Sequence, residues 1–182
     1  MFESIVNIFR MQDLRNRILL TLALLAVYRL GIFIPSPGVD RVALADFFED
    51  TQGTLLSLYN LFSGGALERF SVFVLGIMPY ISASIIMQIG QVMFPFIERL
   101  RAQGQAGSKK INQYTRYLTI GIAIIQSFSI SIGLEQMTTM NNQLVVIEPG
   151  WSFRLMTVIT MTAGSCFVMW LGEQITERGI GQ

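Results

Sequence analysis

The segment from Asn60 to Gln88, NLFSGGALERFSVFVLGIMPYISASIIMQ, is strongly apolar but is interrupted by glycine and proline. The breaks fall at the tripeptide that begins at Ser63, at Gly76 and at Pro79. A break frees backbone N–H and C=O groups that lipid cannot hydrogen-bond, so non-helical backbone at membrane depth is tolerated only inside protein or beside water. The segment therefore predicts a membrane protein with a water-lined pathway.

The composition agrees with a chain that lies in a membrane. Hydrophobic residues make up 52% of the 182 residues, and charged residues only 14%. Soluble domains carry about 25% charged residues, so an integral membrane protein is the better interpretation. The net charge of +1 gives no reason to expect direct DNA binding. The single cysteine, Cys166, lies in an apolar run and is interpreted as a packed thiol.

Four long apolar runs predict membrane-spanning helices at about 18–34, 75–96, 117–134 and 154–171. Each run is close to the length of about 20 residues that a helix needs to cross the hydrocarbon core. Cationic residues gather before the first run and in the loop predicted at 97–116, so both should lie in the cytoplasm. Between the first two runs, Pro35 to Gly38 predicts a helix end, and apolar residues at 42–48 predict a short surface helix. These elements together predict an all-α polytopic fold.

The stretch from Leu55 to Leu75 is too broken to cross the bilayer. It consists of short apolar pieces that are separated by glycines and by the charged pair Glu68-Arg69. A re-entrant half-helix at about 57–70 would keep the freed backbone away from lipid. A loop that lies on the outer membrane surface is the alternative.

A full-length helix is expected from Pro79 to Pro95, and one stripe of it has a useful pattern. At about 100° per residue, Ile77, Ile81, Ser84, Gln88 and Gln91 fall on one side. The outer end of this stripe is bulky and apolar, and its inner end is polar. This order suits an apolar constriction above a wet vestibule, because such constrictions exclude ions by dewetting. The alternative is that the two isoleucines only pack against a neighbouring helix.

Gln88 and Gln126 are uncharged polar residues well inside their apolar runs. Each should seek a hydrogen bond, and interhelical bonds of this kind average only about 0.6 kcal/mol in membranes. Together they predict a weak and reversible contact between helices.

The residue types exclude several classes of chemistry. The chain contains no histidine, which removes Ser-His and Cys-His nucleophile pairs and histidine metal sites. We therefore expect no enzyme activity, no catalytic residue, no metal and no cofactor. The apolar runs also contain no acidic residue, which argues against a proton- or sodium-coupled carrier. Half of a small-molecule secondary transporter with a broken-helix site is kept as the alternative function, and a purely structural scaffold is disfavoured by the polar stripe.

Three separate stretches resemble the bacterial SecY family, the central subunits of the Sec protein translocation channel. They are the Asn60 to Gln88 segment, the cytoplasmic GSKKINQYTRY and the terminal WLGEQITERGIG. The likeness runs through essentially the whole chain, and it implies an N-terminal part, with about four of the family's ten helices, of an inverted-repeat channel that has a re-entrant plug helix. The function implied is protein conduction in Sec-dependent secretion and membrane insertion.

The resemblance also implies roles for particular residues. It assigns the waist of the channel to Ile77 and Ile81, and one side of the lateral gate to Ser82, Ile85, Gln88 and Gln126. The plug residues that it implies are Asn60, Leu61, Phe62, Ser63, Gly64, Gly65, Ala66, Leu67, Glu68 and Arg69.

The same resemblance implies partners and a location. The expected partners are SecE-like and SecG-like membrane subunits, the SecA motor ATPase or a translating ribosome, signal peptides, nascent polypeptides and the lipid bilayer. The expected location is the bacterial plasma (inner) membrane, with the N-terminus in the cytoplasm.

Overall fold

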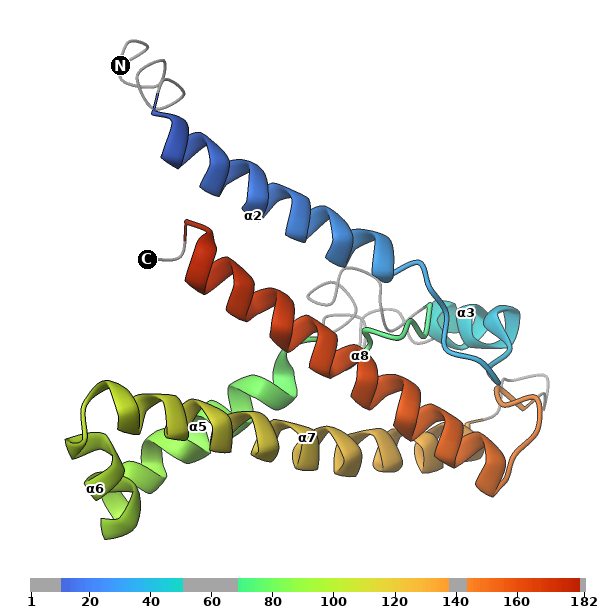
Figure 1. The fold of residues 1–182 in the computed structure, drawn as a ribbon. Helices are drawn as coiled ribbons and strands as arrows, with labels where there is room; N and C mark the ends of the chain where they lie inside the picture. Colours follow the sequence, from blue (N-terminus) through green and yellow to red (C-terminus); the bar gives the residue numbers. More distant parts are fainter. Residues whose placement is uncertain (1–10, 51–68, 138–143, 181–182) are drawn as a thin grey trace.

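The computed structural model describes residues 11–50, 69–137 and 144–180, with side chains given outside 47–50 (Figure 1). This described part is helical, and its only β pairings are two isolated bridges, Pro35 with Ser71 and Val39 with Val146. The expected all-α class is therefore confirmed. The helices are α2 (Gln12–Gly31), α3 (Arg41–Asp50), α5 (Met78–Met93), α6 (Pro95–Ala102), α7 (Gln105–Gln136) and α8 (Trp151–Arg178).

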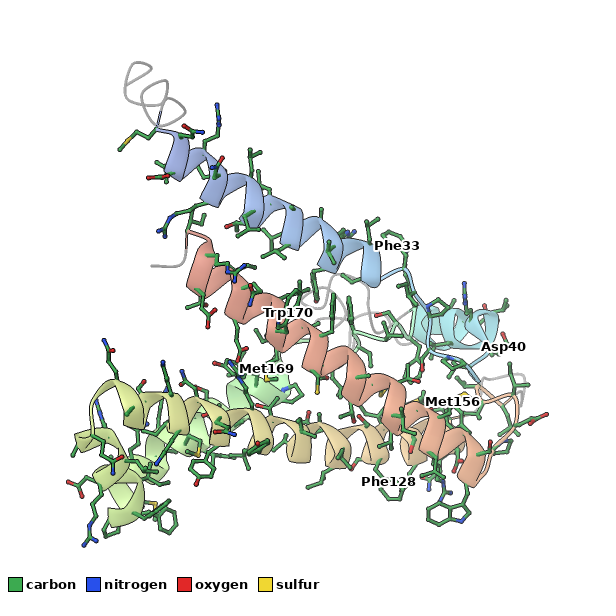
Figure 2. The ribbon with its side chains drawn as sticks, in the orientation of Figure 1. Phe33, Asp40, Phe128, Met156, Met169 and Trp170 are labelled. Atoms are coloured by element: carbon green, nitrogen blue, oxygen red, sulfur yellow. The ribbon has the colours of Figure 1, made fainter. Side chains whose placement is uncertain are left out.

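The short helix α3 lies where the apolar pattern after the first run predicts it. Asp40 precedes α3, and its Oδ1 accepts the backbone N–H of Val42 at 2.9 Å and that of Ala43 at 3.4 Å. An aspartate in this position satisfies N–H groups that have no partner within the helix. Before it, α2 ends at Gly31, ahead of the two prolines, and Phe33 lies just past its end (Figure 2).

The second predicted span is a bent pair of helices. α5 begins at Met78 with Pro79 in its first turn, as expected, but it ends at Met93. Phe94 then takes an extended conformation with ψ 113°, because it precedes Pro95, and α6 leaves at an angle of 96°. The chain therefore turns sharply where a straight helix was expected to reach residue 96.

Helix α7 is much longer than the third apolar run and includes most of the stretch that was assigned to a loop at 97–116. The prediction of a loop used polarity alone. In the structure, Ile111 and Thr115 are buried, and Ile111 joins Met87 and Leu100 in a hydrophobic cluster between α5, α6 and α7. Packing of this apolar side makes the polar segment helical.

Helices α7 and α8 form an antiparallel pair with small polar residues at their contact. Ser127, Ser131 and Thr157 are fully buried there. The hydroxyl of Ser127 donates to the carbonyl of Ala123 at 2.6 Å, within its own helix. Small side chains let two helix backbones approach closely in a membrane. Two ion pairs fasten this pair: Arg116 with Glu173 towards one end, and Glu135 with Arg154 at the other.

In the described ranges, α7 and α8 are each long and apolar enough to cross a membrane, and the bent pair α5 and α6 would make a third span if it is taken as one. Helix α2 is not among them. Every 18-residue window of α2 contains Arg15, Arg17 and Arg29. Its place as the first span stays a prediction.

The non-helical segment 70–77 passes between α2 and α8, as the green trace in Figure 1 shows. The ring of Phe73 stacks on Tyr28 of α2, with centroids 5.7 Å apart, and on Phe167 of α8, at 5.8 Å. A Cβ added at Gly31 would overlap with the Phe73 ring, and one added at Gly164 would overlap with the carbonyl of Val72. Two glycines on opposite helices therefore make room for the segment.

We predict that Gly164→Ala lowers the free energy of unfolding by about 1–3 kcal/mol, because the added methyl group forces the backbone of Val72 to move. The matched control is Gly121→Ala on α7, where an added Cβ meets nothing within 4 Å. That change should be neutral or stabilising, by up to about 1 kcal/mol. Thermal unfolding of the complete gene product in detergent measures both variants, and equal effects would contradict the prediction.

Candidate functional site

The two isoleucines that were expected at a constriction lie one turn apart at the start of α5. Ile77 follows Gly76, which has a φ of +54°, and the Ile77 carbonyl accepts the N–H of Ile81 at 3.1 Å. Ile77 is 39% exposed and Ile81 is 42% exposed. The opposite side of α5 is the buried one, with Pro79, Ala83, Met87 and Gly90. The predicted stripe therefore faces away from the core of the described part.

Ile77 lines a cavity of about 400 Å³ at one end of the α7–α8 pair. Tyr80 lies beside it on α5, and the walls come from α7 and α8. The remaining lining residues are Asn112, Arg116, Met169, Gly172, Glu173, Thr176 and Glu177. Figure 2 shows Met169 between α8 and the α5–α7 pair. The described residues that line this cavity do not include Ile81, so the two isoleucines have different surroundings.

The walls of the cavity combine charged side chains of α7 and α8 with the apolar Ile77 and Met169. Arg116 Nε donates to Glu173 Oε1 at 2.7 Å, which joins α7 to α8. A neighbouring cavity of about 420 Å³ shares Asn112, Arg116 and Glu177 and adds Lys109, Gln113 and Tyr117. Polar walls of this kind hold water readily. The apolar side chain of Ile77 thus lies beside an open space that has charged and polar groups in its walls. The order predicted for the stripe, a constriction above a polar vestibule, stays a prediction.

The candidate gate residues lie on two helices that pack together, α5 and α7. Ile85 is half-exposed, Gln88 is exposed, and Ser82 and Gln126 are partly buried. The amide of Gln88 donates to Ser84 Oγ at 3.4 Å within α5. Among the hydrogen bonds of the described residues, none joins Gln88 to Gln126. Their assignment to a gate stays a prediction.

Most of the candidate plug, residues 60–68, lies outside the described residues. Arg69, its last member, is exposed, and its guanidinium lies over the ring of Phe33 at 4.5 Å from the centroid. Phe33 also has the guanidinium of Arg29 at 5.8 Å. The described side of this junction is therefore an aromatic ring with two cations near it. Each such contact is favourable by about 0.5–1 kcal/mol at exposed sites.

Sequence reasoning missed the contact that closes the other end of the α7–α8 pair. Glu135 Oε2 accepts Arg154 Nε at 2.9 Å, and its Oε1 accepts the backbone N–H of Gly150 at 2.9 Å, just before α8. Arg154 also lies over the ring of Trp151 at 5.4 Å. The sequence did contain a signal. Arg116 and Glu135 are as far apart on α7 as Arg154 and Glu173 are on α8, so an antiparallel pair brings opposite charges together at both ends.

The acidic residues of the described part do not form a metal site. Within residues 11–50, 69–137 and 144–180, no group of three or more His, Cys, Asp or Glu side chains comes together. Glu135 instead forms an ion pair with Arg154, and Glu173 forms one with Arg116. The described site offers apolar bulk, hydrogen-bonding groups and an open cavity of about 400 Å³.

Comparison with known proteins decides the family. The SecY family model matches residues 71–182 of the chain. The chain belongs to the SecY family. It is 50% identical over 169 residues to the protein translocase subunit SecY of Escherichia coli, covering 93% of this chain and 38% of that protein. The same subunit of Buchnera aphidicola is 50% identical over 169 residues, covering 93% of this chain and 47% of that protein.

The Vibrio cholerae protein translocase subunit SecY is 47% identical over 171 residues, which covers 94% of this chain and 38% of that protein. This SecY-family chain thus spans less than half the length of these relatives. The expected family is confirmed, and family and apolar helices together identify a membrane-embedded protein. The alternative of half a small-molecule transporter finds no support, because the relatives are translocase subunits.

We predict that Glu135→Gln and Arg154→Gln each destabilise the α7–α8 pair, because each leaves one charged partner without its counterion at a helix end. The double variant should be less destabilised than the two single effects added together. Thermal unfolding of the complete gene product provides this double-mutant cycle. Additive effects would show that the pair does not couple the helices.

Proposed function

We propose that this chain forms part of a protein-conducting channel for Sec-dependent secretion and membrane insertion. The observation that carries the proposal is the stripe on α5 that faces away from the core, with Ile77 beside a cavity that has charged residues in its walls, and Ile81, Ser84, Gln88 and Gln91 further along. The stripe directly follows a non-helical segment that is enclosed by α2 and α8. Irregular backbone inside protein, next to a wet cavity, is the arrangement that pathways through membranes use.

The proposed mechanism needs no chemistry on the substrate. Ile77 and Ile81 contribute to an apolar waist, which fits around a polypeptide of any sequence because it offers bulk without specific hydrogen bonds. Residues 60–69 form a plug that leaves and returns. Ser82, Ile85, Gln88 and Gln126 form one side of a lateral gate, where a signal helix replaces weak polar contacts with its own apolar surface. This is a population shift between closed and open states.

The proposed orientation places the α6 end of the structure in the cytoplasm. Arg99, Arg101, Lys109 and Lys110 gather around the turn from α6 to α7. The other end of the α7–α8 pair has few cations, and Arg154 there is paired with Glu135. The positive-inside rule supports a cytoplasmic N-terminus in the bacterial inner membrane. The partners in this proposal are SecE-like and SecG-like subunits, SecA or a ribosome, signal peptides and nascent polypeptides.

The central test is ion leakage through the closed channel. We predict that Ile77→Gly combined with Ile81→Gly raises ion conductance of the complete gene product, reconstituted with its partner subunits in planar bilayers, because the waist loses its bulk. The control is Ile86→Gly with Ile89→Gly, which makes the same change to two exposed α5 residues outside the stripe. Unchanged conductance in the first variant would count against a waist at these residues.

A second test concerns the gate. We predict that Gln88→Leu or Gln126→Leu shifts the balance between closed and open gate, since each removes a hydrogen-bonding group worth about 0.6 kcal/mol, which is roughly a threefold change in an equilibrium constant. Export of a reporter with a weakened signal sequence measures the shift. Gln136→Leu, at the exposed end of α7, is the control. If export changed in neither direction, these residues would not belong to a gate.

A further inference from the structure

Ile77 rests against the C-terminal part of α8 at Gly172, a residue without a side chain. A Cβ built on Gly172 would lie 3.5 Å from Ile77 Cδ1, which is ordinary van der Waals contact. Both residues line the same cavity, together with Arg116 and Glu173. The position of the Ile77 side chain is thus limited on one side by the backbone of α8 at Gly172.

The place of α8 at this level depends on an ion pair. Glu173 directly follows Gly172, and its side chain is 19% exposed, while that of Arg116 is 47% exposed. The bond of 2.7 Å between them ties α8 to α7, and α7 in turn packs on α5, which begins just after Ile77. α5, α7 and α8 therefore form a closed chain of contacts around the cavity, in which the ion pair is the polar link.

We infer that Gly172, Arg116 and Glu173 are positioning residues for the constriction. Gly172 is the contact site on α8 for the Ile77 side chain, which we call the seat. The Arg116–Glu173 pair holds α8 at the distance from Ile77 at which this contact forms. The inference rests on the proposed function, because it assigns no role to the seat unless Ile77 belongs to a waist. It predicts that Ile77 contacts Gly172 and that Ile81 does not, although both face the same side of α5.

The contact is tested first without any transport assay. Ile77→Cys with Gly172→Cys, in a Cys166→Ser background of the complete gene product in membranes, should react with the short bifunctional thiol reagent dibromobimane to give an internally cross-linked, fluorescent protein. Ile81→Cys with Gly172→Cys is the matched control and should give little product. Equal labelling of both pairs, or none of either, would overturn the seat.

The positioning role is tested by conductance of the closed channel in planar bilayers. Glu173→Gln and Arg116→Gln should each raise the ion leak several-fold, and Arg116→Glu combined with Glu173→Arg should restore a tight channel. Glu98→Gln, which removes an exposed charge from α6, is the control. A size series at Gly172 adds a second readout. Gly172→Ala should be tolerated, because its Cβ meets Ile77 at ordinary contact distance, whereas Gly172→Leu should displace Ile77 and alter the leak.

Together, these experiments distinguish a failure of the positioning role from a failure of the proposed waist. If the Ile77→Gly and Ile81→Gly double variant leaks but the ion-pair variants stay tight, the waist stands and the positioning role is wrong. If the cross-link forms but none of these variants leaks, the seat is a packing contact only, and both the positioning role and the waist are wrong. If the charge-reversed pair leaks as much as the single variants, the ion pair does not position Ile77.

Discussion

The backbone between Arg69 and Ile77 is not helical, so its N–H and C=O groups need hydrogen-bond partners outside a helix, and the chain after α2 supplies two of them. Ser36 donates its N–H to the Phe70 carbonyl at 2.8 Å, and Val72 donates to the Ile34 carbonyl at 3.0 Å. Short turns within the segment supply further bonds, such as Gly76 N–H to the Phe73 carbonyl at 2.8 Å. An unsatisfied buried group would cost about 1–3 kcal/mol. Phe70 accepts a φ of +44° while it is 2% exposed, which only strong surrounding contacts permit.

The α7–α8 pair supplies the frame against which this segment packs. Arg116 and Glu135 are 19 positions apart on α7, and Arg154 and Glu173 are 19 apart on α8, as their residue numbers show. At 1.5 Å per residue this separation is about 28 Å, close to the hydrocarbon thickness of about 30 Å. No charged residue lies between the paired positions on either helix. The ion pairs therefore lie at the two ends of an uncharged stretch of the α7–α8 pair, and there they fix its register.

The parts of this structure that the sequence predicts are those with a local cause. The break at Gly76, the start of α5 at Met78 with Pro79 in its first turn, and the short helix α3 all follow from residues within one turn. The early start of α7 does not, because it depends on Ile111 packing with Met87 and Leu100. The two ion pairs join distant residues, and Gly172 has no side chain to mark it as a contact for Ile77. The plug lies largely outside the described residues and so remains a prediction.

The chain before Ile77 is held by stronger contacts than the chain after it. Before it, Phe73 is held by two stacked rings, and the segment has backbone hydrogen bonds to the chain after α2. After it, Ile77 meets α8 at a glycine, beside a partly exposed ion pair of a kind worth about 0–1 kcal/mol. Such an energy is comparable with thermal energy, so this ion pair holds the surroundings of Ile77 less firmly than the stacked rings hold the segment before it. The waist that we propose at Ile77 would use this combination, because a constriction built as firmly as the segment before it would open only by disrupting the fold.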